Sequence, residues 1–217
     1  MLPGPNQIIS CPHCAALAKY CTLMSGNTFG ATLWSDARQI APMLPQPPEV
    51  VKCQRCKKCY WLKKAADMGE EDWFRGEGGQ ANPGGEAIPF VMEPDENSYY
   101  QAIDNGLAVS SKQKRHIRML AWWRHNDPWR GNMQGRAPGF SAAGRANLEA
   151  LMQLLDPAGQ PDENDRLMKA EILRELGEFA QASQVLAQVT SAQYAEVVRQ
   201  MQQFCDAKDA SVRELRL

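Results

Sequence analysis

The sequence of 217 residues lacks any long apolar run. A helix needs about 18 consecutive apolar residues or more to cross a membrane, and no such stretch occurs, so we expect no membrane segment. The first ten residues carry no basic side chain and too short an apolar stretch for a secretory signal. We therefore expect a cytoplasmic protein.

Sequence motifs of common enzymes are also missing. The chain contains three histidines but no HExxH, GxSxG, GxGxxG or phosphate-binding GKS or GKT motif. His116 and His125 are nine residues apart, which is too far for both to face one metal ion from adjacent turns of a helix. The sequence gives no support for catalysis, and no catalytic residue is predicted.

Charge is nearly balanced in total and uneven along the chain. The net charge is −1, but it is +6 over residues 1–66, −9 over 67–109, +7 over 110–145 and −5 over 146–217. Such blocks predict either oppositely charged modules that pack together or a basic face that binds nucleic acid.

Glycine and proline gather in two stretches, residues 76–85 and 128–144, which we expect to be loops. The predicted modules are a cysteine-rich module over 1–66, an acidic Gly/Pro-rich linker over 67–92 and a helical region over 93–217. Strand patterns are almost absent after residue 92, so the expected fold class is α+β.

Six of the seven cysteines lie within the first 59 residues. Two Cys-x-x-Cys pairs stand out, because a two-residue gap lets both sulfurs of one turn face one ion, and two such turns supply a tetrahedral set. We predict one structural zinc ion, although four thiolates suit iron as well. The predicted ligands are Cys11, Cys14, Cys53 and Cys56.

The segment between the pairs reads as two short strands, near Ala31–Trp34 and Gln39–Met43, joined by a turn at Asp36. This order, a cysteine turn, a β-hairpin and a second cysteine turn, resembles a zinc ribbon of the rubredoxin-like kind. The resemblance implies that the metal holds a small β-module folded. Glycine commonly follows the second cysteine of each turn in such ribbons, and this chain has Ala15 and Lys57 there.

The remaining cysteines have other predicted roles. Cys59 begins an apolar strand, with the alternative that it replaces Cys53 as a ligand. Cys21 follows a possible short helix at Ala15–Tyr20 and is expected to be a small core residue, as is Cys205 on the last helix. Thiol–disulfide redox chemistry is an alternative function for the first pair, because Cys11-Pro-His-Cys14 resembles the active-site tetrapeptide of oxidising thioredoxin-like proteins.

The helical region carries repeated signals for helix ends. The tetrapeptide PDEN occurs at Pro94–Asn97 and at Pro161–Asn164, where acidic residues would cap helix N-termini. Residues 166–189 resemble a tetratricopeptide-type helical hairpin, through Ala170, Leu173, Gly177, Phe179 and Ala182. That resemblance implies a scaffold, with or without a groove for a partner peptide.

Two further groups are candidate contact surfaces. Tryptophan and arginine dominate protein-binding sites, and they concentrate in one segment as Trp122, Trp123, Arg124, Trp129 and Arg130. The alternative is that these side chains anchor modules of this chain to one another. A basic cluster spans residues 52–64 and consists of Lys52, Arg55, Lys57, Lys58, Lys63 and Lys64.

The chain as a whole resembles a bacterial type of protein, a zinc ribbon followed by a helical bundle or repeat-like region. We expect a non-enzymatic, zinc-binding adaptor for a protein partner. The first alternative is a nucleic-acid-binding ribbon that uses the basic cluster. The second alternative is a thiol–disulfide oxidoreductase that acts through Cys11 and Cys14.

Overall fold

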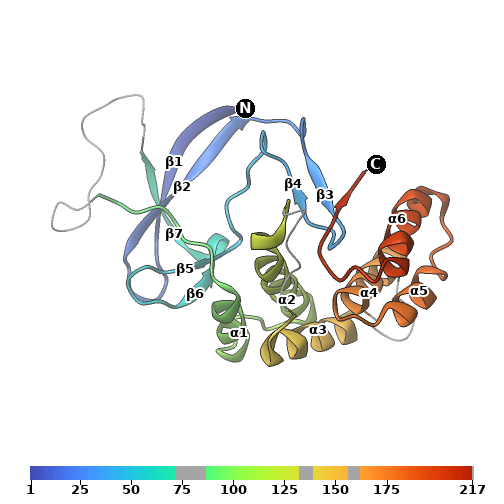
Figure 1. Ribbon diagram of the computed structural model, residues 1–217. Coiled ribbons are helices and arrows are strands. Elements are labelled where there is room, and N and C mark those ends of the chain that lie inside the picture. The colour runs from blue at the N-terminus through green and yellow to red at the C-terminus, as the bar shows by residue number, and fades with distance from the viewer. Residues whose placement is uncertain (72–86, 132–138, 156–161, 217) are drawn as a thin grey trace. The chain divides into compact units, whose positions relative to one another are not determined.

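The computed structural model describes residues 1–71, 87–131, 139–155 and 162–216. These residues form six α-helices and several small antiparallel sheets, so the fold class is α+β, as predicted (Figure 1). They divide into two compact units: unit 1 comprises residues 1–31 and 41–107, and unit 2 comprises residues 32–40 and 108–217. None of the helices in the described ranges has the length and hydropathy that a membrane span requires.

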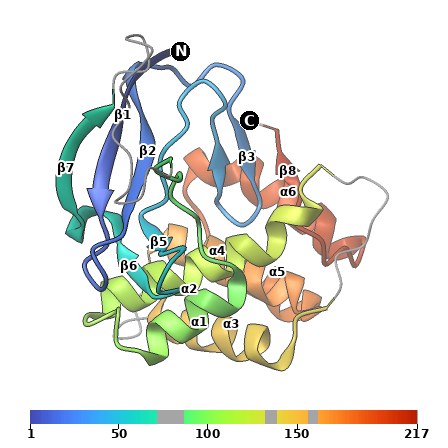
Figure 2. The same cartoon turned by 90° about the vertical axis from the view of Figure 1, so that its left-hand side faces the viewer.

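The larger sheet of unit 1 has three antiparallel strands in the order β2–β1–β7 (Figure 2). They are β1 (Leu2–Ser10), β2 (Leu17–Ser25) and β7 (Ala66–Glu71). Ile8 and Ile9 of the central strand β1 are both buried, although successive side chains point to opposite faces of a sheet, so both faces are covered there. The pairing of β1 with β2 shifts register around Pro3, where proline has no N–H to donate.

Two predictions about the residues around β2 are wrong. The expected short helix at Ala15–Tyr20 is replaced by the start of β2, and Cys21 is exposed on that strand instead of lying in the core. The first part of the predicted linker 67–92 belongs to β7, which pairs with the second edge of β1. A central strand needs hydrogen-bond partners on both edges, and β7 supplies one of them.

A two-stranded sheet of unit 1 joins β5 (Val50–Lys52) to β6 (Cys59–Trp61), with Val51 opposite Tyr60. Both residues are buried, and they form one small core with Ile9 and with two cysteines, Cys11 and Cys53.

Helix α1 (Glu96–Asp104) completes unit 1 and packs against β6. The Trp61 indole N–H donates to the Leu107 carbonyl at 3.0 Å, and Tyr99 is buried. The helical region predicted over 93–217 is therefore divided between the units, because its residues 93–107 belong to unit 1.

Unit 2 contains the other five helices of the described residues. They are α2 (Ser111–Asn126), α3 (Ala142–Leu154), α4 (Glu163–Glu175), α5 (Phe179–Leu186) and α6 (Ala195–Asp206). Helix α4 serves two hydrophobic clusters: Ile172 packs with residues of α2 and α3, and Ala170 packs with residues of α5 and α6. Unit 2 also has short 3₁₀ turns at η3 (Asp127–Trp129) and η5 (Ala192–Tyr194), while η1 (Leu62–Lys64) belongs to unit 1.

The predicted helix ends are confirmed at three places. Asp95 and Asp162, one from each PDEN, cap α1 and α4 by accepting backbone N–H groups. Gly177 ends α4 with φ +86°, in the left-handed region that glycine adopts without strain. Ala182 of α5 is fully buried and α4 packs against α5, so the predicted helical hairpin is present.

The predicted hairpin between the cysteine pairs exists but does not belong to the cysteine module. Strands β3 (Thr32–Trp34) and β4 (Gln39–Ile40) pair with each other, and β3 also pairs with β8 (Glu214–Leu215). The turn residue Asp36 is fully buried in unit 2, where polar groups of the helices surround it. These contacts draw residues 32–40 out of the ribbon predicted over 1–66. Residues 76–85, and residues 132–138 of the predicted loop 128–144, lie outside the described residues.

Candidate metal centre

Each Cys-x-x-Cys pair occupies the turn between two paired strands, the first between β1 and β2 and the second between β5 and β6. In the first turn the Cys11 N–H donates to the Ala16 carbonyl at 2.9 Å, and the Ala15 N–H donates to the Cys11 carbonyl at 2.9 Å. The second turn repeats this pattern. The Cys53 N–H donates to the Lys58 carbonyl at 3.0 Å, and the Lys57 N–H donates to the Cys53 carbonyl at 2.9 Å. The chain thus builds one local structure twice.

The residue after each second cysteine has a left-handed backbone. Its φ is +56° at Ala15 and +61° at Lys57. A residue with a Cβ pays about 1–2 kcal/mol for this conformation, so it persists where the surroundings dictate it. The absence of glycine at these positions therefore does not prevent the left-handed turn.

The two turns bring their four sulfurs together. The Sγ atoms of Cys11, Cys14, Cys53 and Cys56 all lie within 4.8 Å of one another, and this group could hold a metal ion. Two short contacts join the turns: Cys11 Sγ lies 3.9 Å from Cys56 Sγ, and Cys14 Sγ lies 3.6 Å from Cys53 Sγ. A tetrahedron with metal–sulfur bonds of about 2.3 Å has sulfurs about 3.8 Å apart, so the spacing suits four-thiolate coordination.

The local environments of these thiols differ. Burial raises the pKa of Cys11 to about 12, and burial also raises the pKa of Cys56. The backbone N–H of Ala16 lowers the pKa of Cys14 to about 7. All seven cysteines are free thiols, and the sulfur separations are far longer than the roughly 2.05 Å of a disulfide.

The other cysteines lie outside this group. Cys59 begins β6 as predicted, and its Sγ is 3.7 Å from the Ser98 carbonyl, where burial raises its pKa. Cys205 is buried in unit 2, which confirms its predicted core role. Neither is a member of the four-sulfur group, and exposed Cys21 is not one either.

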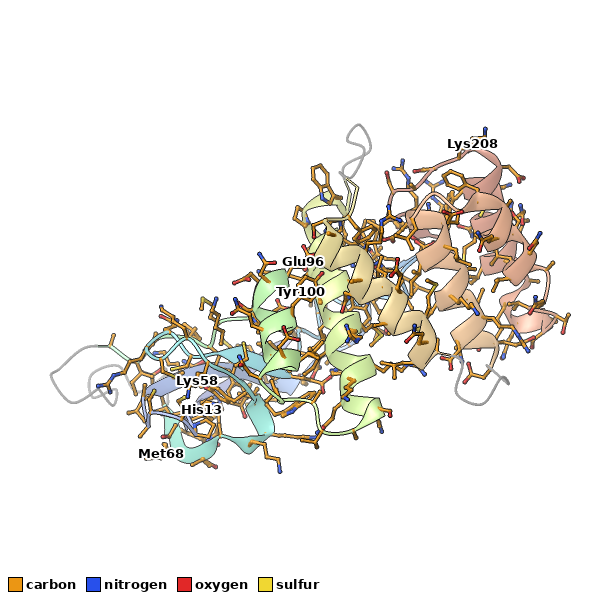
Figure 3. The ribbon with its side chains drawn as sticks, turned by 90° about the horizontal axis from the view of Figure 1, so that it is seen from below. His13, Lys58, Met68, Glu96, Tyr100 and Lys208 are labelled. Carbon is orange, nitrogen blue, oxygen red and sulfur yellow. The ribbon has the colours of Figure 1, made fainter. Side chains whose placement is uncertain are left out.

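His13 sits at the tip of the first turn and reaches toward the second. Its Nε2 is 3.4 Å from the Cys59 carbonyl, and its ring meets Tyr60 edge-on at 6.3 Å between centroids. Figure 3 shows His13 and Lys58 beside one another. His13 therefore connects the two turns and is not a member of the four-sulfur group.

The Trp–Arg segment, predicted to bind a partner, makes contacts within unit 2. Trp122 is 1% exposed and its indole N–H donates to Glu175 at 2.7 Å. The Trp123 indole N–H donates to the Asp36 carbonyl at 2.9 Å. These two rings anchor the β3–β4 hairpin and α4 to α2.

The remaining members of that segment form ion pairs or are partly buried. Arg124 pairs with Asp127 at 3.5 Å, Trp129 is half-buried, and the Arg130 side chain is 5% exposed. The contacts match the anchoring alternative, with Asp36 and Asp127 as the acidic partners of Arg130. Binding of a partner by these five residues stays a prediction.

Sequence reasoning missed a buried polar network in unit 2. The Asn126 amide donates to Asp36 and to Glu175, each at 3.0 Å. Arg174, fully buried, forms an ion pair with Glu171 at 2.5 Å. Burial raises the pKa of Glu175, helped by the nearby Glu171 and Asp36 carboxylates. Polar residues on a helix give no local signal of such burial.

Comparisons with models of protein families, with curated proteins and with solved structures find no match to this chain. The four-cysteine group is therefore the feature from which function is argued.

Proposed function

We propose that this protein is a non-enzymatic adaptor whose N-terminal unit is held folded by one structural zinc ion and which binds a protein partner. The observation that carries the metal proposal is the convergence of four cysteine sulfurs from two turns of the same local structure. Zinc with four thiolates is the commonest use of such a set in a structural role, and it leaves no open position for a substrate.

The small size of the β-core supports a structural role. The core around the cysteines contains few large side chains, and two of its five buried members are Cys11 and Cys53. A core of this size supplies little stability alone, whereas structural zinc contributes on the order of 10 kcal/mol of apparent binding energy.

The pairing of sulfurs across the turns favours metal binding over the redox alternative. A dithiol of the thioredoxin type works through the two cysteines of one motif. Here four sulfurs form one group, with contacts of 3.9 Å from Cys11 to Cys56 and 3.6 Å from Cys14 to Cys53, so a single ion would use both pairs.

Elemental analysis of anaerobically purified protein, with thiol titration before and after chelation, tests this proposal. We expect one zinc per chain and four thiols that react only after chelation. Cys11→Ser and Cys53→Ser should both empty the site and unfold unit 1, while Cys21→Ser, at an exposed position, keeps the zinc. A metal-free protein whose insulin-reducing activity depends on Cys11 but not on Cys53 would replace the adaptor with an oxidoreductase.

A further inference from the structure

The second cysteine turn, residues 53–59, carries cations that have no acidic partner among the residues described. Arg55, Lys57 and Lys58 are exposed, and their side chains form no hydrogen bond or ion pair with any described residue. Neighbouring cations are different: Lys52 pairs with Asp95 at 2.9 Å, and Lys19 pairs with Glu71 at 2.6 Å. The turn therefore offers positive charge that pairs with no carboxylate among the described residues of unit 1.

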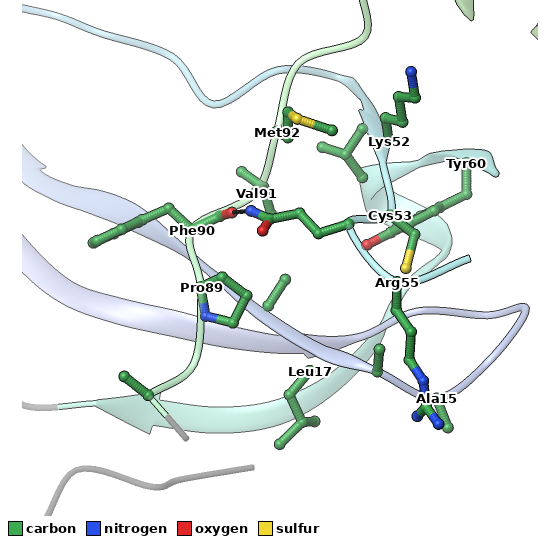
Figure 4. A pocket seen from close by; sticks show the side chains of 15 residues that line it. Ala15, Leu17, Lys52, Cys53, Arg55, Tyr60, Pro89, Phe90, Val91 and Met92 are labelled. Atoms are coloured by element: carbon green, nitrogen blue, oxygen red, sulfur yellow. Dashed lines mark hydrogen bonds between the residues drawn. The ribbon is translucent and has the colours of Figure 1, made fainter. Parts of the chain in front are cut away.

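A pocket of about 700 Å³ lies on one side of this turn; we call it the Phe90 pocket. Its walls include Arg55 and, across from it, Pro89 and Phe90 (Figure 4). The Phe90 side chain is 49% exposed, while its carbonyl accepts a hydrogen bond from the Gln54 amide at 2.8 Å. The backbone is thus fixed, and the half-exposed ring has the Lys19 ammonium 5.1 Å from its centroid.

A second pocket, of about 530 Å³, lies on the other side of the turn; we call it the His13 pocket. Lys57 and Lys58 line it together with two amide side chains, Gln101 of α1 and Asn105, which follows the last residue of α1. Ammonium and amide N–H groups are donors that suit a carboxylate. One turn therefore separates a partly apolar pocket with an arginine from a polar pocket with two lysines.

The charge of unit 1 as a whole limits what can bind. Residues 52–64 contain six Lys and Arg and no Asp or Glu, but the whole of unit 1 contains eight basic and eleven acidic residues. Nucleic-acid binding depends on cations spread along the path of many phosphates. Positive charge confined to one turn fits a short acidic segment better than a long polyanion.

We propose that this turn is the docking site for a partner protein's segment that carries a large apolar side chain between acidic residues. The apolar side chain enters the Phe90 pocket beside Leu17 and Met92, and carboxylates on its two sides pair with Arg55 and with Lys57 and Lys58. This inference rests on the proposed adaptor function and names the chemistry of its partner.

The test selects peptides from a displayed library of random twelve-residue segments on the full-length, zinc-loaded protein. Enriched peptides are synthesised, and their Kd values are measured by fluorescence anisotropy. We expect an aromatic or leucine side chain flanked by Glu or Asp. The variant Arg55→Glu/Lys58→Glu should bind them at least about tenfold more weakly, and Phe90→Ala should also weaken them.

The matched control is Lys112→Glu/Lys114→Glu, which changes the net charge equally at exposed positions of α2. It should leave peptide binding within about twofold of the unmodified chain. The zinc content of each variant is measured in parallel, so that a lost metal is not mistaken for a lost contact.

Two results would overturn the docking site while leaving the zinc proposal intact: enriched peptides without acidic residues, or equal binding by Arg55→Glu/Lys58→Glu and its control. A labelled RNA or DNA oligonucleotide that binds at low salt, and is released by the same variant, would assign the turn to nucleic acid instead. An unmodified chain without zinc would overturn the proposed function itself.

Discussion

Asp36 and Arg130, ninety-four residues apart, form a buried two-point ion pair in unit 2. The Arg130 Nη1 and Nη2 atoms donate to the two carboxylate oxygens at 3.0 and 2.6 Å, and the side chains are 5% and 0% exposed. The Arg130 guanidinium also lies over the Trp34 ring, 5.3 Å from its centroid. This pair joins the β3–β4 hairpin to the residue that follows η3.

Replacing Arg130 should therefore be costly. Arg130→Ala leaves Asp36 as an uncompensated buried charge, for which we expect a loss of about 3–5 kcal/mol in the free energy of unfolding. Arg124→Ala, on the partly exposed pair with Asp127, should cost less than about 1 kcal/mol. Urea unfolding followed by circular dichroism compares the two variants. Similar small losses in the free energy of unfolding would show that the buried pair is not important for stability.

Glu175 should make stability depend on pH. Its pKa is raised in the folded protein, so the folded state keeps a proton that the unfolded state loses above its ordinary pKa. Stability should then fall as pH rises from about 4.3 toward the raised pKa. Glu175→Gln mimics the protonated form and should flatten this part of the curve. Unfolding free energies measured from pH 4 to 8 test it; an unchanged slope would assign the pH dependence to another group.

Features set by neighbouring residues could be predicted from the sequence. The cysteine spacing identified the four sulfurs that converge, because each turn depends on its own few residues. The caps at Asp95 and Asp162 and the stop at Gly177 are local in the same sense. Each is a short-range effect that a helix or turn needs wherever it occurs.

Features set by distant partners could not be predicted. Residues 15–20 suit a helix by composition, but pairing with β1 makes them enter a strand, with Ala18 opposite Ile9. Asp36 looked like an ordinary turn residue, and nothing near it in the sequence indicates that Arg130 will pair with it. Tertiary contacts override local preference in both cases.

Metal removal should affect the two units differently. If the four-cysteine group holds the ion, chelation should expose the amides of β1, because two of the cysteines belong to its core. The amides of α4 should stay protected, since its two hydrophobic clusters belong to unit 2. Hydrogen exchange followed by mass spectrometry measures both. Equal loss of protection in β1 and α4 would mean that the units do not unfold independently.

The left-handed residues of the two cysteine turns give a final prediction. Ala15→Gly and Lys57→Gly should each stabilise the turn, because glycine adopts φ near +60° without a Cβ clash. The greater freedom of glycine in the unfolded chain offsets part of this gain, so we expect about 0.5 kcal/mol at each site.

Ala16→Gly is the matched control, because Ala16 is not among the residues with positive φ and its carbonyl hydrogen bond is kept. It should destabilise the turn by about 0.5–1 kcal/mol through unfolded-state entropy alone. Thermal unfolding, together with zinc competition against a chromogenic chelator, ranks the three variants. If Ala15→Gly weakens zinc binding as much as Ala16→Gly does, the left-handed turn is not the conformation that holds the metal, because relief of strain should act in the opposite direction.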